Sequence, residues 1–289
     1  MFELHIKTLK FNHYIKNVIV IIPLLFSMNF TNPVLWLKCV VIFLAFCLIS
    51  SAVYVMNDLI DIEKDRLHPI KCHRPIASGK ISKKLAYSLM FLLICVSSVL
   101  ALTLNIPCLI VILLYFILNI FYTLWLKQIA LIDVACIALG FVLRIVAGCM
   151  AINVIPSALV ILLTFFASMF FTFSKRKLEL QLTKDDRRES IKEFNIEIAN
   201  QFILINAILS IAFYFTYVLD KTTIARAGRE YLYITVIPFT LIFFRLLLLV
   251  NISTSENDDP IHFIEKDKPL KFIFWFYVLI LILVLTVLK

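Results

Sequence analysis

Charged residues and glycines are both scarce in this chain. Only 16% of its 289 residues are charged, whereas about a quarter are charged in an average soluble domain. Apolar residues make up 62% of the chain. This composition excludes an ordinary soluble enzyme and indicates a membrane protein with several spans. Because there are only four glycines, few positions favour a break in a helix, and we expect fairly continuous spans.

The chain also lacks the spacing of a cysteine-based metal or redox site. None of its seven cysteines forms a Cys-x-x-Cys pair, and six of them lie in apolar runs. We therefore interpret them as small buried residues rather than as ligands. The N-terminus is polar and basic, and it lacks the small-residue cleavage site that is typical of a signal peptide.

Nine apolar segments are candidates for membrane spans, because a helix needs about 20 residues to cross a bilayer. They comprise residues 16–29, 35–56, 84–104, 107–126, 130–152, 157–174, 198–219, 231–250 and 271–288. Linkers of only a few residues, such as 105–107 and 153–156, require antiparallel neighbours on either side. The sequence therefore predicts an all-α bundle of nine transmembrane helices, of which the first is the shortest.

The Lys and Arg residues are distributed unevenly around these spans. With a cytoplasmic N-terminus, most of the 28 bases flank the cytoplasmic ends of the spans, as the positive-inside rule requires. Five fall on the opposite side: Lys38, Lys221, Arg226, Arg229 and Lys289. The net charge of +9 then belongs mainly to the inner membrane face, where it contacts anionic lipid. Nucleic acid is not an expected partner, because the bases lie in loops beside the membrane.

A dense group of charges follows the second predicted span. In a helix that advances about 100° per residue, Asn57, Asp58, Asp61 and Asp65 fall within one arc of about 100°. Carboxylates on one face repel one another unless a cation neutralises them, and Mg²⁺ prefers oxygen ligands of this kind. Asp58, Asp61 and Asp65 are therefore candidate metal ligands and catalytic residues, with Asn57 beside them.

Several bases come directly after these aspartates. Pro69 should end the helix near Leu67, so that the following loop can fold back over the carboxylates. Arg66, Lys71 and Arg74 are then candidate ligands for phosphate oxygens, to which Arg binds in a fork and Lys as a point charge. The alternative is an acidic helix end followed by bases that only fix the topology.

The pattern NDLIDIEKD over residues 57–65, at the end of a second span, resembles the UbiA superfamily of intramembrane prenyltransferases. The resemblance covers essentially the whole chain. It implies a single transmembrane domain over residues 1–289, two aspartate motifs, a Mg²⁺-bound diphosphate and a lateral opening for a polyprenyl chain. We expect a bacterial cell membrane, and the distribution of Lys and Arg predicts that the site faces the cytoplasm.

One part of the family pattern is missing. Where the second aspartate motif is expected, at the end of the sixth span, the chain reads FSKRKLEL over residues 173–180. Lys175, Arg176 and Glu179 share a helical arc of about 100°, with Lys177 on the opposite side. Two bases with one acid suggest a grip on phosphate rather than a second metal site.

Five fragments resemble the decaprenyl-phosphate phosphoribosyltransferase branch of this superfamily. They are HYIKNVIVIIPLLFS (13–27), DRLHPIKCHRPIASGKIS (65–82), FVLRIVAG (141–148), KRKLEL (175–180) and DDPIHFIEKDKPL (258–270). The resemblance implies transfer of 5-phosphoribose from phosphoribosyl diphosphate to a membrane polyprenyl phosphate. Mg²⁺ would neutralise the departing pyrophosphate. The acceptor phosphate is already an anion at neutral pH and needs no strong general base.

Further candidate ligands lie at the ends of the spans. Lys16 and Asn17 sit where the first span enters the membrane, and they match the family fragment there. Tyr122 and Lys127 end the fourth span on the cytoplasmic side. The alternatives are a lysine that snorkels to the interface and a tyrosine that anchors the helix there.

One base lies in the middle of a span. A charge at the position of Arg144 is costly unless it is paired or hydrated. We expect its partner to be either Asp133 or a substrate phosphate, and we include Arg144 among the candidate substrate ligands.

Two other functions compete with phosphoribosyl transfer. One is an ordinary UbiA enzyme, which moves a prenyl group from its diphosphate onto an aromatic or other small acceptor; two aspartates within residues 175–179 would favour it. The other is a transporter or channel, which predicts charged or broken helices near the bilayer midplane. The charges here collect instead at the cytoplasmic ends of the spans.

Overall fold

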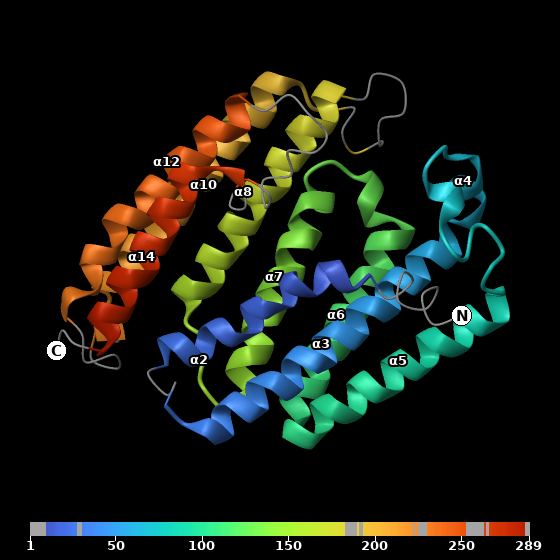
Figure 1. The fold of residues 1–289 in the computed structure, drawn as a ribbon, viewed down its shortest axis with the longest axis horizontal. Coiled ribbons are helices and arrows are strands. Elements are labelled where there is room, and N and C mark those ends of the chain that lie inside the picture. Colours follow the sequence, from blue (N-terminus) through green and yellow to red (C-terminus); the bar gives the residue numbers. More distant parts are fainter. Residues whose placement is uncertain are drawn as a thin grey trace. The chain divides into compact units, whose positions relative to one another are not determined.

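The computed structural model describes residues 10–27, 31–182, 190, 193–221, 223–224, 230–252, 263 and 266–286. Over these residues the chain is helical and contains no β-strand (Figure 1). Eight helices are long and apolar enough to cross a membrane. The prediction of an all-α integral membrane protein is therefore confirmed for the described part of the chain.

These eight helices correspond to eight of the nine predicted spans. They are α3 (Pro33–Ile60), α5 (Lys83–Leu104), α6 (Ile106–Leu124), α7 (Ile132–Ala151), α8 (Ala158–Leu182), α10 (Ile196–Leu219), α12 (Val236–Ile252, preceded by η4, Glu230–Thr235) and α14 (Lys268–Thr286). The first predicted span corresponds to a shorter apolar helix, formed by η1 (Phe11–Ile21) and α2 (Ile22–Phe26). The count of nine spans and the cytoplasmic N-terminus stay predictions.

The chain divides into two compact units. Unit 1 comprises residues 1–25, 29–124 and 143–155, and unit 2 comprises residues 26–28, 125–142 and 156–289. Helix α7 runs through the division, with its first part in unit 2 and its second part in unit 1. The single domain over residues 1–289 stays a prediction.

In unit 1, helix α3 is the central element. It packs most extensively against α5 and also contacts α6 and η1 (Figure 1). Its fully buried side chains include Ile42, Phe46 and Ile49, which share a core with Ile112 of α6. The hydroxyl of Ser97 on α5 donates a 2.8 Å hydrogen bond to the carbonyl oxygen of a residue on α3. This packing holds the C-terminal end of α3, where the aspartates begin, on a rigid helix.

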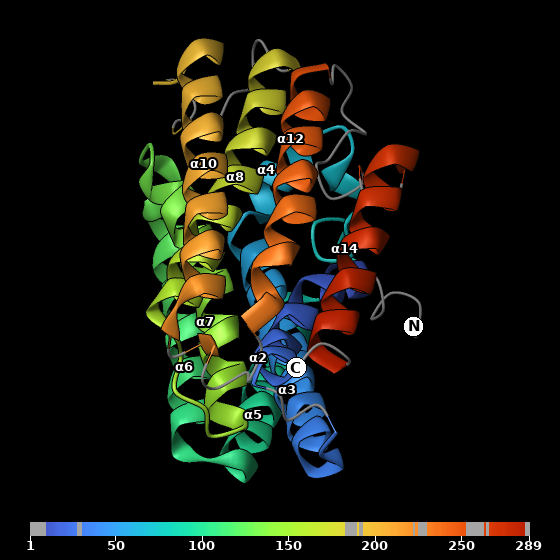
Figure 2. The ribbon, with the colours of Figure 1, turned by 90° about the vertical axis from the view of Figure 1, so that its left-hand side faces the viewer.

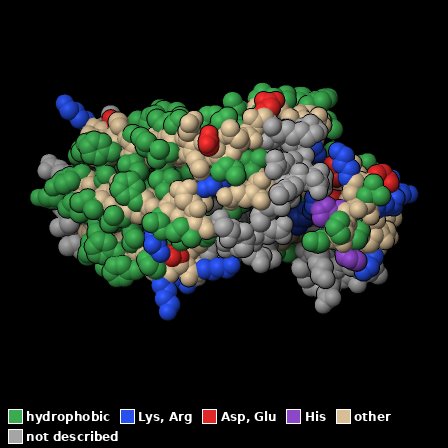
Figure 3. Space-filling view, turned by 90° about the horizontal axis from the view of Figure 1, so that it is seen from above, with side chains coloured by type: hydrophobic (Ala, Val, Ile, Leu, Met, Phe, Trp, Pro, Cys, Tyr) green, Lys and Arg blue, Asp and Glu red, His purple; other side chains and the backbone are tan. Residues whose placement is uncertain are grey.

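In unit 2, α8 packs against α10, and α12 packs against α10 and α14; Figure 2 shows these helices side by side. Phe170 of α8 and Phe243 of α12 meet edge to face, with ring centroids 5.3 Å apart. Exposed apolar side chains occur on the outer surfaces of these helices, for example Phe272 and Trp275 of α14, and Figure 3 shows hydrophobic side chains over much of the left-hand part of the view. Such surfaces suit contact with lipid.

Arg245 of α12 lies within the predicted span 231–250, and it has a carboxylate partner. Its guanidinium donates to both oxygens of Asp267, at 3.1 and 2.7 Å. This hydrogen bonding holds the pKa of the Asp267 carboxyl below its ordinary value. Asp267 also accepts the backbone N–H of Leu270 at 2.7 Å. The pair thus ties α12 to the first turn of α14.

A close helix contact in unit 1 depends on a glycine. A Cβ atom added at Gly148 of α7 would overlap the backbone carbonyl oxygen of Val20 in η1. A backbone atom cannot turn aside as a flexible side chain can, so the two segments would have to separate. We expect Gly148→Ala to destabilise the protein by about 1–3 kcal/mol, measured as a lower thermal unfolding midpoint in detergent. An unchanged midpoint would show that η1 does not pack this closely on α7.

Candidate functional site

Two predicted metal ligands lie at the end of the long central helix of unit 1. Asp58 is in the last turn of α3, and Asp65 is in the short helix α4 (Ile62–Leu67). The break between them falls at Asp61, but the backbone bonds from Asp61 to Asn57 and from Asp65 to Asp61 keep helical spacing. Both carboxylates are therefore on one side of the chain, and both residues are buried.

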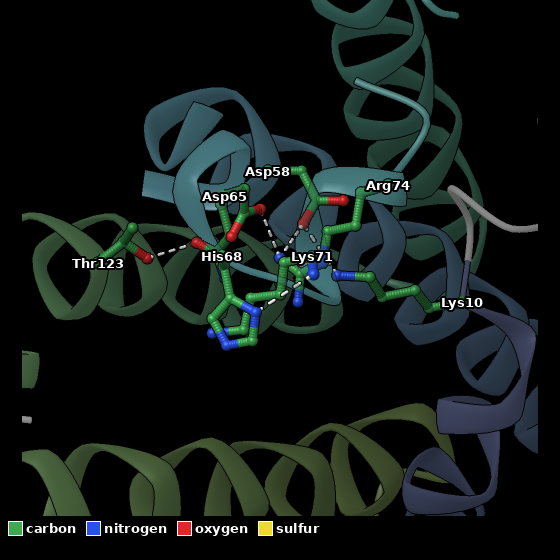
Figure 4. A network of polar contacts seen from close by, with 8 residues as sticks. Lys10, Asp58, Asp65, His68, Lys71, Arg74 and Thr123 are labelled. Atoms are coloured by element: carbon green, nitrogen blue, oxygen red, sulfur yellow. Dashed lines mark hydrogen bonds and ion pairs between the residues drawn. The ribbon is translucent and has the colours of Figure 1, made fainter. Parts of the chain in front are cut away.

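A single arginine nitrogen joins these two carboxylates. The Nη1 atom of Arg74 donates to Asp58 Oδ1 at 3.1 Å and to Asp65 Oδ2 at 2.7 Å (Figure 4). Arg74 follows the 3₁₀ turn η2 (Lys71–His73). The loop after α4 thus folds back over the aspartates, as predicted.

A second base at this site was not predicted. Lys10 precedes η1, and its Nζ atom lies 3.0 Å from Asp58 Oδ1 (Figure 4). The same atom lies 4.9 Å from the centroid of the Tyr54 ring. Lys10 is 48 residues from Asp58 along the chain. Beyond its place in the basic N-terminal arm, the sequence holds no signal for this contact.

The loop that carries Arg74 is shaped by its own side chains. Helix α4 ends at Leu67, as predicted from Pro69. The Nδ1 atom of His68 then accepts the backbone N–H groups of Ile70 and Lys71, at 3.1 and 3.3 Å. These bonds close a turn that directs the chain back toward the carboxylates (Figure 4).

The other two predicted bases of this loop occupy different surroundings. Arg66 donates through Nε to the carbonyl oxygen of Ala77 at 3.1 Å and through Nη1 to the exposed Glu63 at 3.1 Å. Arg66 therefore braces the loop. Lys71 is exposed, so its ammonium group is accessible at the surface next to the network.

Helix α6 supports the site from a third element. The hydroxyl of Thr123 donates a 2.6 Å hydrogen bond to the side-chain oxygen of Asn57 (Figure 4). This bond joins the C-terminal ends of α3 and α6. Tyr122 is half-buried in the same turn of α6, and Lys127 follows in the 3₁₀ turn η3 (Leu126–Gln128).

Two other predicted residues meet in the interior of unit 1. The Nε atom of Arg144 donates to the Asn17 side-chain oxygen at 2.8 Å, although the residues are 127 positions apart. The Nη2 atom of Arg144 donates to the Tyr115 hydroxyl at 3.0 Å, and the guanidinium lies 4.8 Å from the centroid of that ring. Arg144 is only 7% exposed. Lys16 precedes Asn17 on η1 and is half-buried.

The expected pairing of Arg144 with Asp133 is wrong. Asp133 is bonded to Arg176 instead, at 3.0 Å. Both Asp133 and Arg144 belong to α7, where eleven residues rise by about 16 Å. That separation is too great for an ion pair, although the two residues lie on a similar face of the helix.

In unit 2, Arg176 and Glu179 of α8 form a compact cluster with Asp133. Arg176 donates through Nε to Asp133 and through Nη1 to both oxygens of Glu179, at 3.0 and 2.9 Å. Ser190 also donates to Asp133, at 3.1 Å. Lys175 is exposed. Lys177 points away, as predicted, and its Nζ atom donates to the side-chain oxygen of Asn251 at 2.7 Å.

Two of the three predicted carboxylate ligands in unit 1 have positions that suit Mg²⁺. Within the described residues, no three His, Cys, Asp or Glu side chains are grouped closely enough to hold a metal ion. Asp58 and Asp65 nevertheless converge on one cationic nitrogen. Mg²⁺ is commonly bound by one or two carboxylates together with waters and substrate phosphates. These two aspartates fit that pattern, whereas the role of Asp61 as a third ligand stays a prediction.

The chain is similar to known proteins over most of its length. A profile of the UbiA prenyltransferase family matches residues 18–266. The decaprenyl-phosphate phosphoribosyltransferase of Mycolicibacterium smegmatis is 31% identical over 246 residues, which cover 82% of this chain and 77% of the relative. The enzyme of the same name from Corynebacterium glutamicum is 29% identical over 274 residues, covering 92% and 82%.

A solved structure shares the fold. The UbiA homologue from Archaeoglobus fulgidus bound to GPP and Mg²⁺ matches with a TM-score of 0.71, over 98% of this chain and 100% of that chain. The sequence identity is 18%. At this identity the similarity shows a shared fold. GPP and Mg²⁺ are ligands of the homologue.

Proposed function

The chain belongs to the UbiA prenyltransferase family, and from that premise we propose that it transfers 5-phosphoribose from phosphoribosyl diphosphate to a membrane polyprenyl phosphate. The products would be polyprenyl-phosphoryl-5-phosphoribose and pyrophosphate. Support comes from two relatives named decaprenyl-phosphate phosphoribosyltransferase that align over most of the chain. The observation that carries the proposal is that residues 173–180, where the family's second aspartate motif is expected, contain no aspartate. The arginine of this segment, Arg176, bonds to Glu179 and Asp133.

The residues of unit 1 suit the donor side of this reaction. An oxygen of the lipid phosphate forms a bond to ribose C1 as the bond from C1 to the pyrophosphate oxygen breaks, and pyrophosphate leaves with the electron pair. A Mg²⁺ ion held by Asp58 and Asp65 would neutralise charge on the leaving pyrophosphate. We propose Asp61 as a further ligand to this ion. Asn57 would orient the end of α3 through its bond to Thr123.

The donor and acceptor together carry more phosphate groups than one metal ion can neutralise. Arg74 is the first candidate for the diphosphate, because its guanidinium already lies at the two carboxylates. Lys71 is exposed beside it. The remaining candidate ligands for the diphosphate, the ribose 5-phosphate and the lipid phosphate are Lys16, Arg66, Lys175 and Arg176. Further candidate substrate ligands are Asn17, Tyr122, Lys127, Arg144 and Glu179.

We propose that the reaction occurs at the cytoplasmic face of a bacterial cell membrane. The clustering of Lys and Arg at one set of helix ends supports this orientation. Phosphoribosyl diphosphate is a soluble, highly anionic sugar, and it is available in the cytoplasm. In sealed inverted vesicles, externally added donor should be consumed, whereas in right-side-out vesicles it should not. Consumption only in right-side-out vesicles would reverse the orientation.

The reaction is tested by following pyrophosphate release. Purified protein in nanodiscs is incubated with phosphoribosyl diphosphate, Mg²⁺ and polyprenyl phosphate. We expect one pyrophosphate for each lipid-linked phosphoribose, and no release when polyprenyl phosphate is omitted or EDTA is added. Turnover of a prenyl diphosphate with an aromatic acceptor, without any phosphoribosyl product, would contradict the proposal.

A further inference from the structure

The carboxylates of unit 1 are already neutralised by bases of the same chain. Asp58 and Asp65 are both buried, and a buried carboxylate is costly unless it is paired. Arg74 bonds to both of them, and Lys10 bonds to Asp58. Two negative charges therefore face two positive charges. A divalent cation that bound to these carboxylates would therefore compete with Lys10 and Arg74.

The bases are the partners that can move. Asp58 and Asp65 are fixed on helices, with side chains only 2% and 6% exposed. The side chains of Arg74 and Lys10 are 34% and 21% exposed. Both are long, and neither residue lies within a helix: Arg74 follows η2, and Lys10 precedes η1. Their charged ends can therefore leave the carboxylates without breaking a helix.

A phosphate ligand would offer these bases a new partner. Arg binds phosphate oxygens in a fork, and Lys binds them as a point charge. A bound diphosphate also restores the charge balance that a divalent cation disturbs. The same two side chains can thus neutralise the carboxylates first and the phosphate afterwards.

We propose that Lys10 and Arg74 are internal counter-ions of Asp58 and Asp65, and that binding of a divalent cation with a diphosphate transfers both bases from the carboxylates to the phosphate oxygens. This inference rests on the metal–diphosphate part of the proposed function, and it adds Lys10 to the site. Arg74 should have the larger effect, because it bonds to both carboxylates, whereas Lys10 bonds to Asp58.

The exchange predicts opposite effects of one substitution on two binding measurements. The first titrates Mn²⁺ alone into the full-length protein in nanodiscs and measures bound metal by electron paramagnetic resonance. Arg74→Met removes a competitor of the metal, so we expect Mn²⁺ to bind about tenfold more tightly, a change of 1.4 kcal/mol. Lys10→Met should change the affinity in the same direction by a smaller factor.

The second measurement follows labelled inorganic pyrophosphate at a fixed, saturating Mn²⁺ concentration. Here Arg74→Met removes a phosphate ligand, and we expect pyrophosphate to bind about tenfold more weakly. Lys64→Met is the matched control, because Lys64 is an exposed base on α4 beside Asp65 and its removal changes the net charge equally. Its two affinities should stay at the wild-type values.

The two affinities together support or overturn the proposed exchange. Unchanged or weaker Mn²⁺ binding by Arg74→Met and Lys10→Met would overturn the exchange, as would unchanged pyrophosphate binding by Arg74→Met. If Arg74→Met fails to fold, Arg74→Gln removes the charge and keeps a hydrogen-bond donor, and the same two shifts are expected. Neither measurement contains phosphoribosyl diphosphate or polyprenyl phosphate, so a failure of phosphoribosyl transfer in the product assay is distinguishable from a failure of this exchange.

Discussion

Asp58→Asn is expected to lower the turnover number by about a hundredfold to a thousandfold, the range found when one preorganised electrostatic group is removed from an active site. Asp58 accepts from both Lys10 and Arg74, and we propose it as a metal ligand. Asparagine keeps the shape and one oxygen but removes the negative charge. The loss should therefore appear in catalysis rather than in folding, and it should be accompanied by weaker Mn²⁺ binding.

The comparison variants for this prediction lie on the same segment. Glu63 is on α4, and its side chain is 76% exposed, so Glu63→Gln should retain a turnover number close to that of the wild type. Asp61→Asn tests the third predicted ligand, and we expect it to abolish turnover while the protein stays folded. An Asp58→Asn protein that works within a few-fold of the wild type would remove the metal-site assignment.

Arg176→Met is expected to have the largest effect on stability. Arg176 is nearly fully buried and bonds to Asp133 and Glu179. Its removal would leave the buried carboxylate of Asp133 without its guanidinium partner. Breaking a buried ion pair in this way costs about 3–5 kcal/mol. The free energy of unfolding in mixed micelles, measured with a chemical denaturant, should fall by that amount.

A double variant separates the cost of an unpaired charge from the loss of packing. Asp133→Asn combined with Arg176→Met removes both charges, so most of the lost stability should return. Lys175→Met, at an exposed position next to Arg176, should change the free energy of unfolding by less than about 0.5 kcal/mol. A double variant no more stable than Arg176→Met would show that unpaired charge is not the cause.

Local features of this protein were well predicted from sequence. Helical periodicity predicted that Lys177 lies opposite the arc shared by Lys175, Arg176 and Glu179, and Pro69 predicted the end of α4 at Leu67. These predictions depend on residues a few positions apart, whose geometry the helix itself determines. The ends of helices in charged segments were predicted less well. The apolar run of the sixth predicted span ends near residue 174, but α8 continues to Leu182.

The contacts that complete the site could not be predicted in the same way. Lys10 meets Asp58 across 48 positions, Asp133 meets Arg176 across 43 and Asn17 meets Arg144 across 127. Each pair depends on how separate helices pack, and a single sequence contains no periodic signal for that packing. Charge alone suggested Asp133 as the partner of Arg144, but the rise of α7 separates them.

The most direct test of phosphoribosyl transfer follows the phosphorus of the lipid. Purified protein with Mg²⁺ receives polyprenyl phosphate labelled with ³²P and unlabelled phosphoribosyl diphosphate, and in a parallel reaction a labelled prenyl diphosphate with an aromatic acceptor. We predict that in the first reaction the label stays in the lipid fraction, in a product heavier by one phosphoribosyl group, and that the released pyrophosphate is unlabelled. Labelled pyrophosphate from the second reaction, with no phosphoribosyl lipid in the first, would contradict the proposed function.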